Sequence, residues 1–339
     1  MGNRMQTELH FTDKANEMMR TMPSYVKTYI RSIHNNTSPR TRYEYLKDIQ
    51  MFLDYVKDAN NLSLVTTDDL NKLTKNDFEE YFEYIEHYEK NGQERKNGRK
   101  SIARKLSALR RFFAYLFESE MITSDEIRKI PMPKVHHKEI IHMESDETTD
   151  FLNIVEKGTK MTPQQLAYHK KQAVRDSAIV YLMLSTGIRV SECAELDIND
   201  IDLKHHCIHI TRKGGNEATV YFSDEATQYI QDYLKERKKI KGIDNEKALF
   251  LSSQKKRLNV RSIEILIKKY AKFAIPGKKI TPHKLRSTFA TNLYNETGDI
   301  YLVAETLGHS DVTTTKEHYA NLSNKRKEEA RNKVTFKKT

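Results

Sequence analysis

Apolar side chains recur at helical spacing through the first third of the chain. Tyr25, Tyr29 and Ile33 follow one another at four-residue steps, and a longer segment begins at Ser38-Pro39. The apolar positions of that segment that fall on one side are Tyr45, Ile49, Phe52, Leu53 and Val56. Because residues three or four apart share one face of a helix, the pattern predicts amphipathic helices that pack together as a bundle.

Further signals flank these helices. Residues 78–88 predict a third helix, and a polar, glycine-containing break follows at 90–98. Another helix is predicted from near Ser101, and its inward positions are Ile102, Leu106, Leu109, Phe113 and Leu116. Residues 1–22 are polar with scattered methionines, a pattern compatible with either a short helix or a tail.

The second half of the chain mixes two periodicities. Helical patterns are found within residues 151–156, 175–184, 226–238 and 260–273. Residues 207–211 and 218–222 are strand-like and are separated by a Gly-Gly turn, which indicates a β-hairpin. We therefore predict a mainly α fold with a small β-sheet or hairpin.

A chain of 339 residues is long enough for two domains with a core each. The stretch Lys-Ile-Pro-Met-Pro-Lys-Val-His-His-Lys, which begins at Lys129, is basic and Pro-punctuated and suits a semi-extended linker. The predicted organisation is an N-terminal extension (1–23), a helical-bundle domain (24–130), a linker (131–143), an α+β domain (144–322) and a Lys-rich tail (323–339).

Positive charge indicates a polyanionic partner. The chain has 58 Lys plus Arg against 47 Asp plus Glu, a net charge of +11. Residues 95–111 hold eight basic side chains and no acid, and they overlap the helix predicted from near Ser101. A charge run is usually a solvated face, but an ordered helix can present its charges to double-stranded DNA. The side chains that we predict to contact DNA are Arg104, Lys105, Arg110, Arg111 and, in a later helix, Lys284.

Several other classes of protein are disfavoured. Cys193 and Cys207 cannot build a disulfide framework and match no zinc spacing, so we expect buried thiols in a reducing compartment. The adjacent His136-His137 lacks further ligands, and no metal is predicted. The chain lacks an apolar run of membrane-spanning length, a signal-peptide core and a Gly-x-x-x-x-Gly-Lys-Ser/Thr motif, so we expect a cytoplasmic protein without a cofactor.

Candidate chemistry is concentrated between Thr281 and Tyr319. Thr281-Pro282 predicts a helix start, because Thr can cap free amides and Pro fits the first helical position. His283 and Arg286 are three residues apart and share one face of that helix. The N-terminus of a helix carries partial positive charge and unpaired N–H groups, so this end is a natural place for an anion.

His-x-x-Arg is common by chance, and a His near a helix start is more often a surface or capping residue. The other motifs of the chain raise its significance. Arg189 follows Gly187 in Ser-Thr-Gly-Ile-Arg-Val-Ser-Glu, and Lys213 lies beside the Gly-Gly turn of the hairpin, where a solvated Lys is the simpler interpretation. Leu-Gly-His ends at His309, and Tyr319 is the last tyrosine of the chain.

These five separated segments resemble, in their order, the tyrosine site-specific recombinases, or phage integrases, and most closely those of Xer type. The resemblance covers the chain from about Ser24 to Tyr319. It implies that the scissile phosphate is held by Arg189, Lys213, His283, Arg286 and His309, with Glu192 in a supporting role and Tyr319 as nucleophile. The spacing from His309 to Tyr319 is ten residues, one more than is usual in the family.

The resemblance also implies partners and a reaction. It predicts a helical DNA-binding domain, a catalytic domain, a homo-tetramer on two recombination sites joined through a four-way junction, and a C-terminal tail that docks onto a neighbouring subunit. An accessory protein remains open as a further partner. Two alternatives are a type IB topoisomerase, which rejoins the same strand, and a DNA-binding regulator of the same fold that does not cleave.

Overall fold

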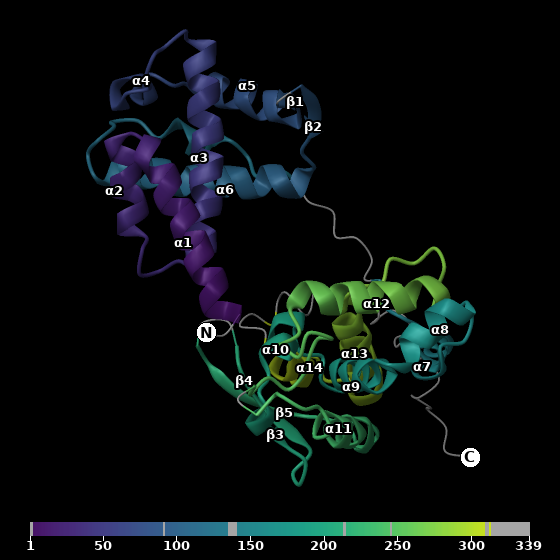
Figure 1. Ribbon diagram of the computed structural model, residues 1–339. Coiled ribbons are helices and arrows are strands. Elements are labelled where there is room, and N and C mark those ends of the chain that lie inside the picture. The colour runs from purple at the N-terminus through teal and green to yellow at the C-terminus, as the bar shows by residue number, and fades with distance from the viewer. Residues whose placement is uncertain are drawn as a thin grey trace, which may run out of the picture. The chain divides into compact units, whose positions relative to one another are not determined.

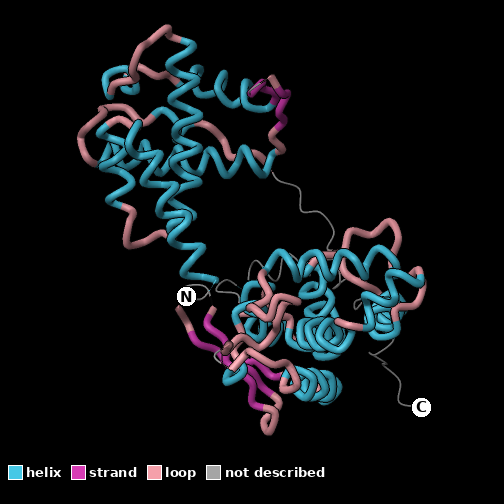
Figure 2. Tube along the Cα trace, viewed as in Figure 1, coloured by secondary structure: helices cyan, strands magenta, loops and turns pink. Residues whose placement is uncertain are grey.

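The computed structural model describes residues 3–90, 92–134, 141–212, 215–244, 246–308 and residue 312 (Figure 1). The chain divides into two compact units, residues 1–136 and 137–339. Both are built mainly of helices, and strands are confined to short segments (Figure 2). The prediction of a mainly α, two-domain fold with a small sheet is therefore confirmed.

The first unit is a helical bundle with a small hairpin. Its helices are α1 (Asn3–Thr21), α2 (Ser24–Ser32), α3 (Pro39–Ala59), α4 (Thr67–Asn71), α5 (Lys75–Glu86), α6 (Arg99–Glu118) and the 3-10 helix η1 (Glu126–Lys129). Four of the five positions predicted to face inward on α3 are buried, namely Ile49, Phe52, Leu53 and Val56. Tyr45 is only partly buried, and it packs at the edge of this core.

The N-terminal segment is a helix rather than a tail. α1 packs along α3, where the ring of Phe11 lies 5.7 Å from that of Tyr43. Ala15 and Met22 are buried in the same hydrophobic cluster as α3 and α6. The packing decides between the two alternatives that the sequence left open, because a polar helix gains most of its stability from tertiary contacts.

The prediction of a helix over residues 78–88 is wrong at its C-terminal end, and the segment 90–98, predicted to be a break, forms part of a hairpin. α5 stops at Glu86, and β1 (His87–Lys90) pairs antiparallel with β2 (Gln93–Lys96), so that Tyr88 faces Arg95. The connecting sequence is Asn91-Gly92, and Gly92 has the positive φ of 70° that a tight hairpin turn needs. Asn-Gly between short strands is a strong hairpin signal, so the sequence did contain this information.

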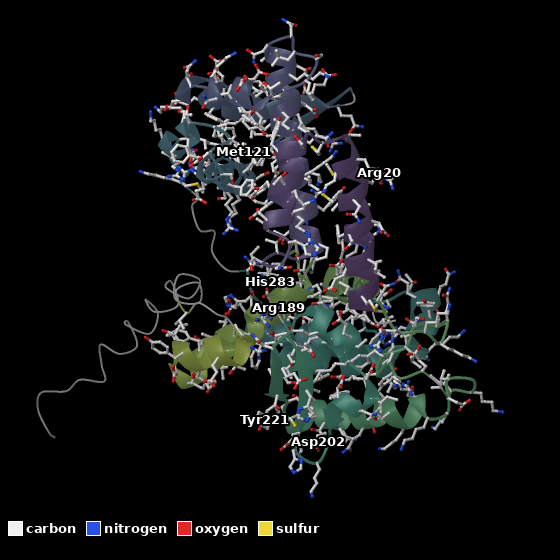
Figure 3. The ribbon with its side chains drawn as sticks, turned by 90° about the vertical axis from the view of Figure 1, so that its left-hand side faces the viewer. Arg20, Met121, Arg189, Asp202, Tyr221 and His283 are labelled. Carbon is white, nitrogen blue, oxygen red and sulfur yellow. The ribbon has the colours of Figure 1, made fainter. Side chains whose placement is uncertain are left out.

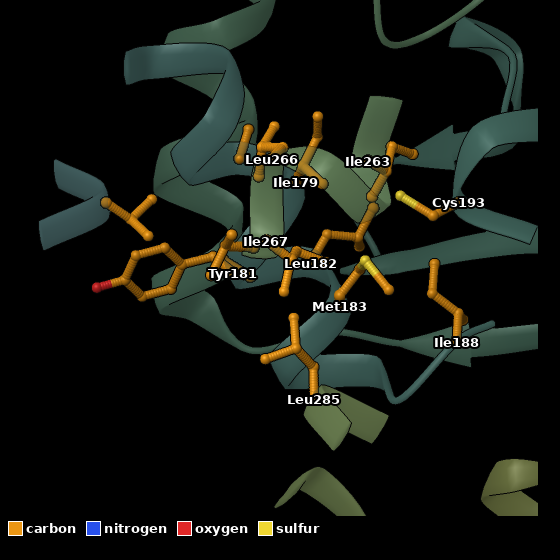
Figure 4. Packing of buried hydrophobic residues seen from close by; sticks show 14 of the residues in the cluster. Ile179, Tyr181, Leu182, Met183, Ile188, Cys193, Ile263, Leu266, Ile267 and Leu285 are labelled. Atoms are coloured by element: carbon orange, nitrogen blue, oxygen red, sulfur yellow. The ribbon is translucent and has the colours of Figure 1, made fainter. Parts of the chain in front are cut away.

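The second unit is arranged around one buried helix. The helices of this unit are α7 (Ser145–Lys157), α8 (Pro163–Lys170), α9 (Ala173–Thr186), α10 (Val190–Glu195), α11 (Asp224–Arg237), α12 (Val260–Ala274), α13 (Pro282–Thr297), α14 (Ile300–Leu307) and the 3-10 helix η2 (Ile198–Asp200). Every residue from Asp176 to Met183 in α9 is buried, and α7, α11 and α13 pack against it. Figure 4 shows this core, to which α12 contributes Ile263 and Ile267.

A small antiparallel sheet lies beside these helices, with its strands in the order β3-β4-β5. β3 (Ile201–Asp202) is short, and the sequence did not predict it. β4 (Cys207–Thr211) pairs with β5 (Glu217–Tyr221), confirming the predicted hairpin. Cys193 and Cys207 are free and buried, and burial raises the pKa of the Cys193 thiol to about 12.

The helix that carries the His-x-x-Arg motif starts where the sequence predicts. Pro282 is its first residue, and Thr281 is the N-cap. The expected side-chain cap is absent, however, because the Thr281 hydroxyl accepts no hydrogen bond from the first turn. The Thr281 carbonyl instead accepts the N–H groups of Lys284 at 2.8 Å and Leu285 at 3.1 Å.

Candidate active site

Arg189 lies at the start of α10, where Glu192 holds it. The carboxylate of Glu192 accepts the backbone N–H of Arg189 at 2.7 Å and its Nη1 at 2.8 Å. The side chain of Glu192 is 6% exposed and that of Arg189 is 36% exposed. A guanidinium fixed on one side by a buried carboxylate and open on the other is well placed to bind an anion.

A glycine at the end of α9 brings α13 close to this turn. Gly187 has a φ of 62°, the left-handed conformation in which many helices end. A Cβ at this position would lie 2.4 Å from Cδ1 of Phe289 on α13. Only glycine therefore satisfies both the backbone and the packing, and Arg189, two residues further on, is held near α13.

Arg286 links three of the motif segments through its side chain. Its Nη1 donates to the carbonyl of Gly187 and its Nη2 to that of Leu307, each at 2.6 Å. The side chain is buried. A guanidinium has five N–H donors, so these two bonds do not by themselves prevent it from binding phosphate. Arg286 thus joins α13 to the end of α9 and to the end of α14. The end of α9 lies just before Arg189 in the sequence, and the end of α14 lies just before His309.

His283 lies one turn before Arg286 on α13, and its side chain is exposed. Figure 3 labels His283 and Arg189, and in that view both lie at the same edge of the second unit. Lys284 is half-buried, and burial lowers the pKa of its amine. The described residues therefore bring Arg189, Glu192, His283 and Arg286 into one region.

Three of the predicted site residues, Lys213, His309 and Tyr319, lie outside the described residues. The described residues directly before Lys213 and His309, namely Arg212 and Gly308, are in contact with each other. Arg212 donates from Nη2 to the carbonyl of Thr306 at 2.8 Å and from Nη1 to that of Glu305 at 3.4 Å. The sequence did not single out Arg212, and its local pattern contains no signal for a contact with a segment 93 residues away.

The basic residues of α6 fall into two groups. Asp48 on α3 is almost completely buried and accepts hydrogen bonds from both terminal nitrogens of Arg104 and from Nζ of Lys105 at 2.9 Å. The Lys105 side chain is only 10% exposed. This placement favours a structural role for Lys105 over the predicted DNA contact, because its amine is buried against Asp48, whereas Arg104, which binds the same carboxylate, keeps 46% of its side chain exposed.

Arg104 and Arg111 remain at the surface of α6. Arg111 donates to the hydroxyl of Tyr45 at 3.2 Å, which tethers it without neutralising it. Arg110 is half-buried and donates to the carbonyls of Ile130 and Arg128. Fewer of the basic side chains of α6 are therefore exposed than the sequence suggests.

Among the described residues, no group of three or more His, Cys, Asp or Glu side chains is arranged to hold a metal ion. Within the same residues, no helix combines the length and the apolar character needed to cross a membrane.

Comparisons with known proteins show the family of the chain. Residues 142–326 match the model of the phage integrase family, and residues 26–120 match that of the phage integrase N-terminal SAM-like domain. The chain is 33% identical to tyrosine recombinase XerS of Streptococcus agalactiae serotype III (strain NEM316), covering 97% of this chain and 100% of that protein. It is 34% identical to XerS of Streptococcus thermophilus (strain CNRZ 1066), covering 92% and 95%.

Solved structures share the fold. The XerH site-specific recombinase bound to palindromic difH substrate, a post-cleavage complex, superimposes with a TM-score of 0.67 at 20% identity, covering 95% of this chain and 88% of that chain. The Tn1549 transposon integrase in complex with circular intermediate DNA gives 0.64 at 22% identity, covering 88% and 95%.

The fold and the clustered motif residues define a two-domain enzyme of DNA strand breakage and rejoining. The chain belongs to the phage integrase family, and it is a tyrosine recombinase.

Proposed function

We propose that Tyr319 cleaves DNA at a site that the protein recognises, within a pocket formed by Arg189, Lys213, His283, Arg286 and His309. The observation that carries this proposal is the pair of bonds from Arg286 to the carbonyls of Gly187 and Leu307. These bonds hold α13, which bears His283 and Arg286, against the end of α9, two residues before Arg189, and against the end of α14 before DNA is present. Such preorganisation is what stabilisation of a charged transition state requires.

The chemistry follows from the residue types. A tyrosine hydroxyl has a pKa near 10 in water, so it becomes an effective nucleophile when a base removes its proton or cations stabilise the phenolate. His283 and His309 can accept this proton or donate hydrogen bonds. As the bond from Tyr319 to phosphorus forms, negative charge grows on the non-bridging oxygens, which the guanidiniums of Arg189 and Arg286 bind.

Departure of the 5′-oxygen completes the cleavage. As the bond from phosphorus to this oxygen breaks, Lys213 donates a proton to it, leaving a 3′-phosphotyrosine and a 5′-hydroxyl. The covalent link retains the energy of the phosphodiester bond. The 5′-hydroxyl of another strand can therefore attack it and rejoin the DNA without nucleotide hydrolysis.

We further propose that the protein works as a homo-tetramer on two copies of its site. Two sequential strand exchanges would pass through a four-way junction, with residues 323–339 of one subunit docking onto the next. A lambda integrase of the same fold, with a TM-score of 0.59, has been described as a tetramer bound to a Holliday junction, which supports this assembly. The exposed Arg104 and Arg111 of α6 are proposed to contact the DNA backbone.

The test is to trap the covalent intermediate. Purified protein is incubated in chelator with nicked duplex fragments of its own genome, so that the short strand diffuses away after cleavage. We expect protein-linked DNA that survives detergent, and the trapped DNA identifies the site. The variant Tyr319→Phe should bind the same DNA and form no adduct. An adduct with this variant would refute the nucleophile, and loss of the adduct in chelator would reopen a metal-dependent mechanism.

A further inference from the structure

The side chain of Arg212 attaches the described part of the β4–β5 turn to α14. The backbone of Arg212 closes the turn, since its N–H donates to Asn216 at 2.7 Å and its carbonyl accepts from Gly215 at 3.1 Å. Among the described residues of the turn, 212, 215 and 216, the hydrogen bonds that leave the hairpin come from the Arg212 side chain, which reaches the carbonyls of Glu305 and Thr306. Arg212 thus connects the described end of this hairpin to α14.

Two arginines share the C-terminal end of α14. The last carbonyls of a helix lack intrahelical partners and lie at its partially negative end, so they attract cations. Arg212 binds Glu305 and Thr306, and Arg286 binds Leu307. Because Arg286 also binds Gly187, the end of α14 keeps a contact with the rest of the unit that does not involve Arg212. Removing Arg212 should therefore release the hairpin rather than the helix.

Gly308 provides the space for this contact. Its φ of 65° is the left-handed conformation that ends α14. A Cβ at Gly308 would lie 1.3 Å from Nη1 and 2.3 Å from Cζ of Arg212. Any side chain at position 308 would displace the guanidinium, so Gly308 and Arg212 form one structural unit.

The guanidinium of Arg212 also lies within electrostatic reach of the anion site. Burial lowers the pKa of Arg212, the charge of Glu192 raises it, and the charge of Arg189 lowers it. The contact between the hairpin and α14 is thus made beside the residues that are proposed to hold the scissile phosphate.

We propose that Arg212 is a positioning residue for the recombination reaction: by anchoring the β4–β5 turn to the end of α14, it places Lys213 to protonate the leaving 5′-oxygen. Lys213 is the next residue in the chain, so its Cα lies only about 3.8 Å from that of Arg212. The inference rests on the proposed role of Lys213 as the acid. Arg212 touches no reacting atom in this account and acts through its neighbour.

A substrate with a sulfur atom in place of the bridging 5′-oxygen separates this role from a general loss of structure. A thiol has a pKa near 8.5, far below that of an alcohol, so a thiolate leaves without being protonated. A variant that lacks only proper delivery of this proton should cleave the sulfur substrate as the unmodified protein does. The probe is a nicked duplex that carries the trapped genomic site, prepared with oxygen or sulfur at the scissile position.

We expect Lys213→Ala to slow cleavage of the oxygen substrate by about 100-fold or more, and Arg212→Ala to slow it by about 10-fold or more. With the sulfur substrate, both variants should come within about threefold of the unmodified protein. Arg212→Lys, which keeps a cation but loses the two-pronged contact, should fall between Arg212→Ala and the unmodified protein. The matched control is Arg237→Ala, which removes another arginine that binds backbone carbonyls, those of Ala248 and Leu249. Any cleavage defect of this control should be equal on both substrates.

The outcomes separate the two proposals. If Lys213→Ala recovers with sulfur and Arg212→Ala does not, the positioning role of Arg212 is wrong and Lys213 remains the acid. If Lys213→Ala does not recover, the assignment of the acid fails and the inference fails with it.

A double-variant cycle gives a second readout. Gly308→Ala and Arg212→Ala should each slow cleavage of the oxygen substrate, and combining them should add little, since each breaks the same contact. Full additivity would contradict a shared contact.

Discussion

At the scale of single residues, Arg286 combines a structural contact to two carbonyls with the proposed binding of phosphate, a combination that only an arginine can provide. Its two terminal nitrogens each bind a carbonyl, Gly187 on one side and Leu307 on the other. A lysine has one nitrogen at the end of a flexible chain and cannot reproduce a planar, two-pronged contact. The residue that is proposed to bind phosphate is therefore also the one that keeps its neighbours in register.

This leads to a prediction for Arg286→Lys. Cleavage of the nicked site should fall by about 100-fold or more, because both transition-state binding and the alignment of the three segments are impaired. DNA affinity should change by only a few fold, since many contacts share the binding energy. Single-turnover cleavage and equilibrium binding at one salt concentration measure the two effects. Cleavage at the unmodified rate would refute the role.

Residues differ in how far the sequence reveals them. The sequence predicts Arg189, His283 and Arg286 as site residues because their motifs are local and follow the order of a known family. Arg212 belongs to no such local motif, because its contacts are with the carbonyls of α14, 93 residues further along the chain. The charge run predicts a DNA contact for Lys105, and it contains no sign of the partner Asp48, which lies 57 residues earlier. Long-range pairing of side chains is what the local pattern lacks.

At the scale of elements, α6 divides its basic side chains between the interior and the surface. Lys105 should contribute to the folding stability of the bundle, and Arg111 should contribute to DNA binding. Lys105→Ala should lower the free energy of unfolding by about 2 to 3 kcal/mol, since it removes one partner from the buried carboxylate of Asp48. Arg111→Ala should change it by less than about 0.5 kcal/mol, because this side chain is exposed.

DNA binding should show the opposite order. Arg111→Ala should weaken binding and reduce the slope of log K against log salt by about one, the change expected when one phosphate contact is lost. Lys105→Ala should leave that slope unchanged. Urea unfolding and salt-dependent binding of the same two variants provide both measurements. A reduced salt slope in Lys105→Ala would restore Lys105 as a DNA contact.

The sequence predicts strongly periodic elements well and short ones poorly. α3, α12 and the β4–β5 hairpin were predicted because their apolar patterns persist over several residues. β3 has two residues and α4 has five, too few to establish a period, and their stability comes from packing and capping. The β1–β2 hairpin is not predicted, although Asn91-Gly92 is a hairpin signal, because the polar composition of residues 90–98 also suits an irregular break.

At the scale of the whole molecule, the two large hydrophobic cores of the described residues lie in different units, and a third, small cluster of Ala290, Val303 and Leu307 belongs to the second unit. Every buried residue of one cluster lies between Ala15 and Ile130, and every buried residue of the other lies between Met143 and Leu285. Burial of apolar surface is the main stabilising contribution in each unit, and neither cluster draws a residue from the other unit. Each unit should therefore have its own free energy of unfolding, independent of the other unit.

We predict that residues 1–134 and 141–339 fold as separate polypeptides, each with its own cooperative thermal transition. In the full-length protein, Phe52→Ala should destabilise only the first unit and Leu182→Ala only the second, because each side chain is fully buried in its own cluster. The loss should be about 3 to 5 kcal/mol for Phe52→Ala and 2 to 5 kcal/mol for Leu182→Ala. Circular dichroism and calorimetry of the two pieces and of the two full-length variants test this. A single transition that both substitutions shift equally would contradict this prediction. It would show that the two units of this recombinase unfold together as one cooperative structure.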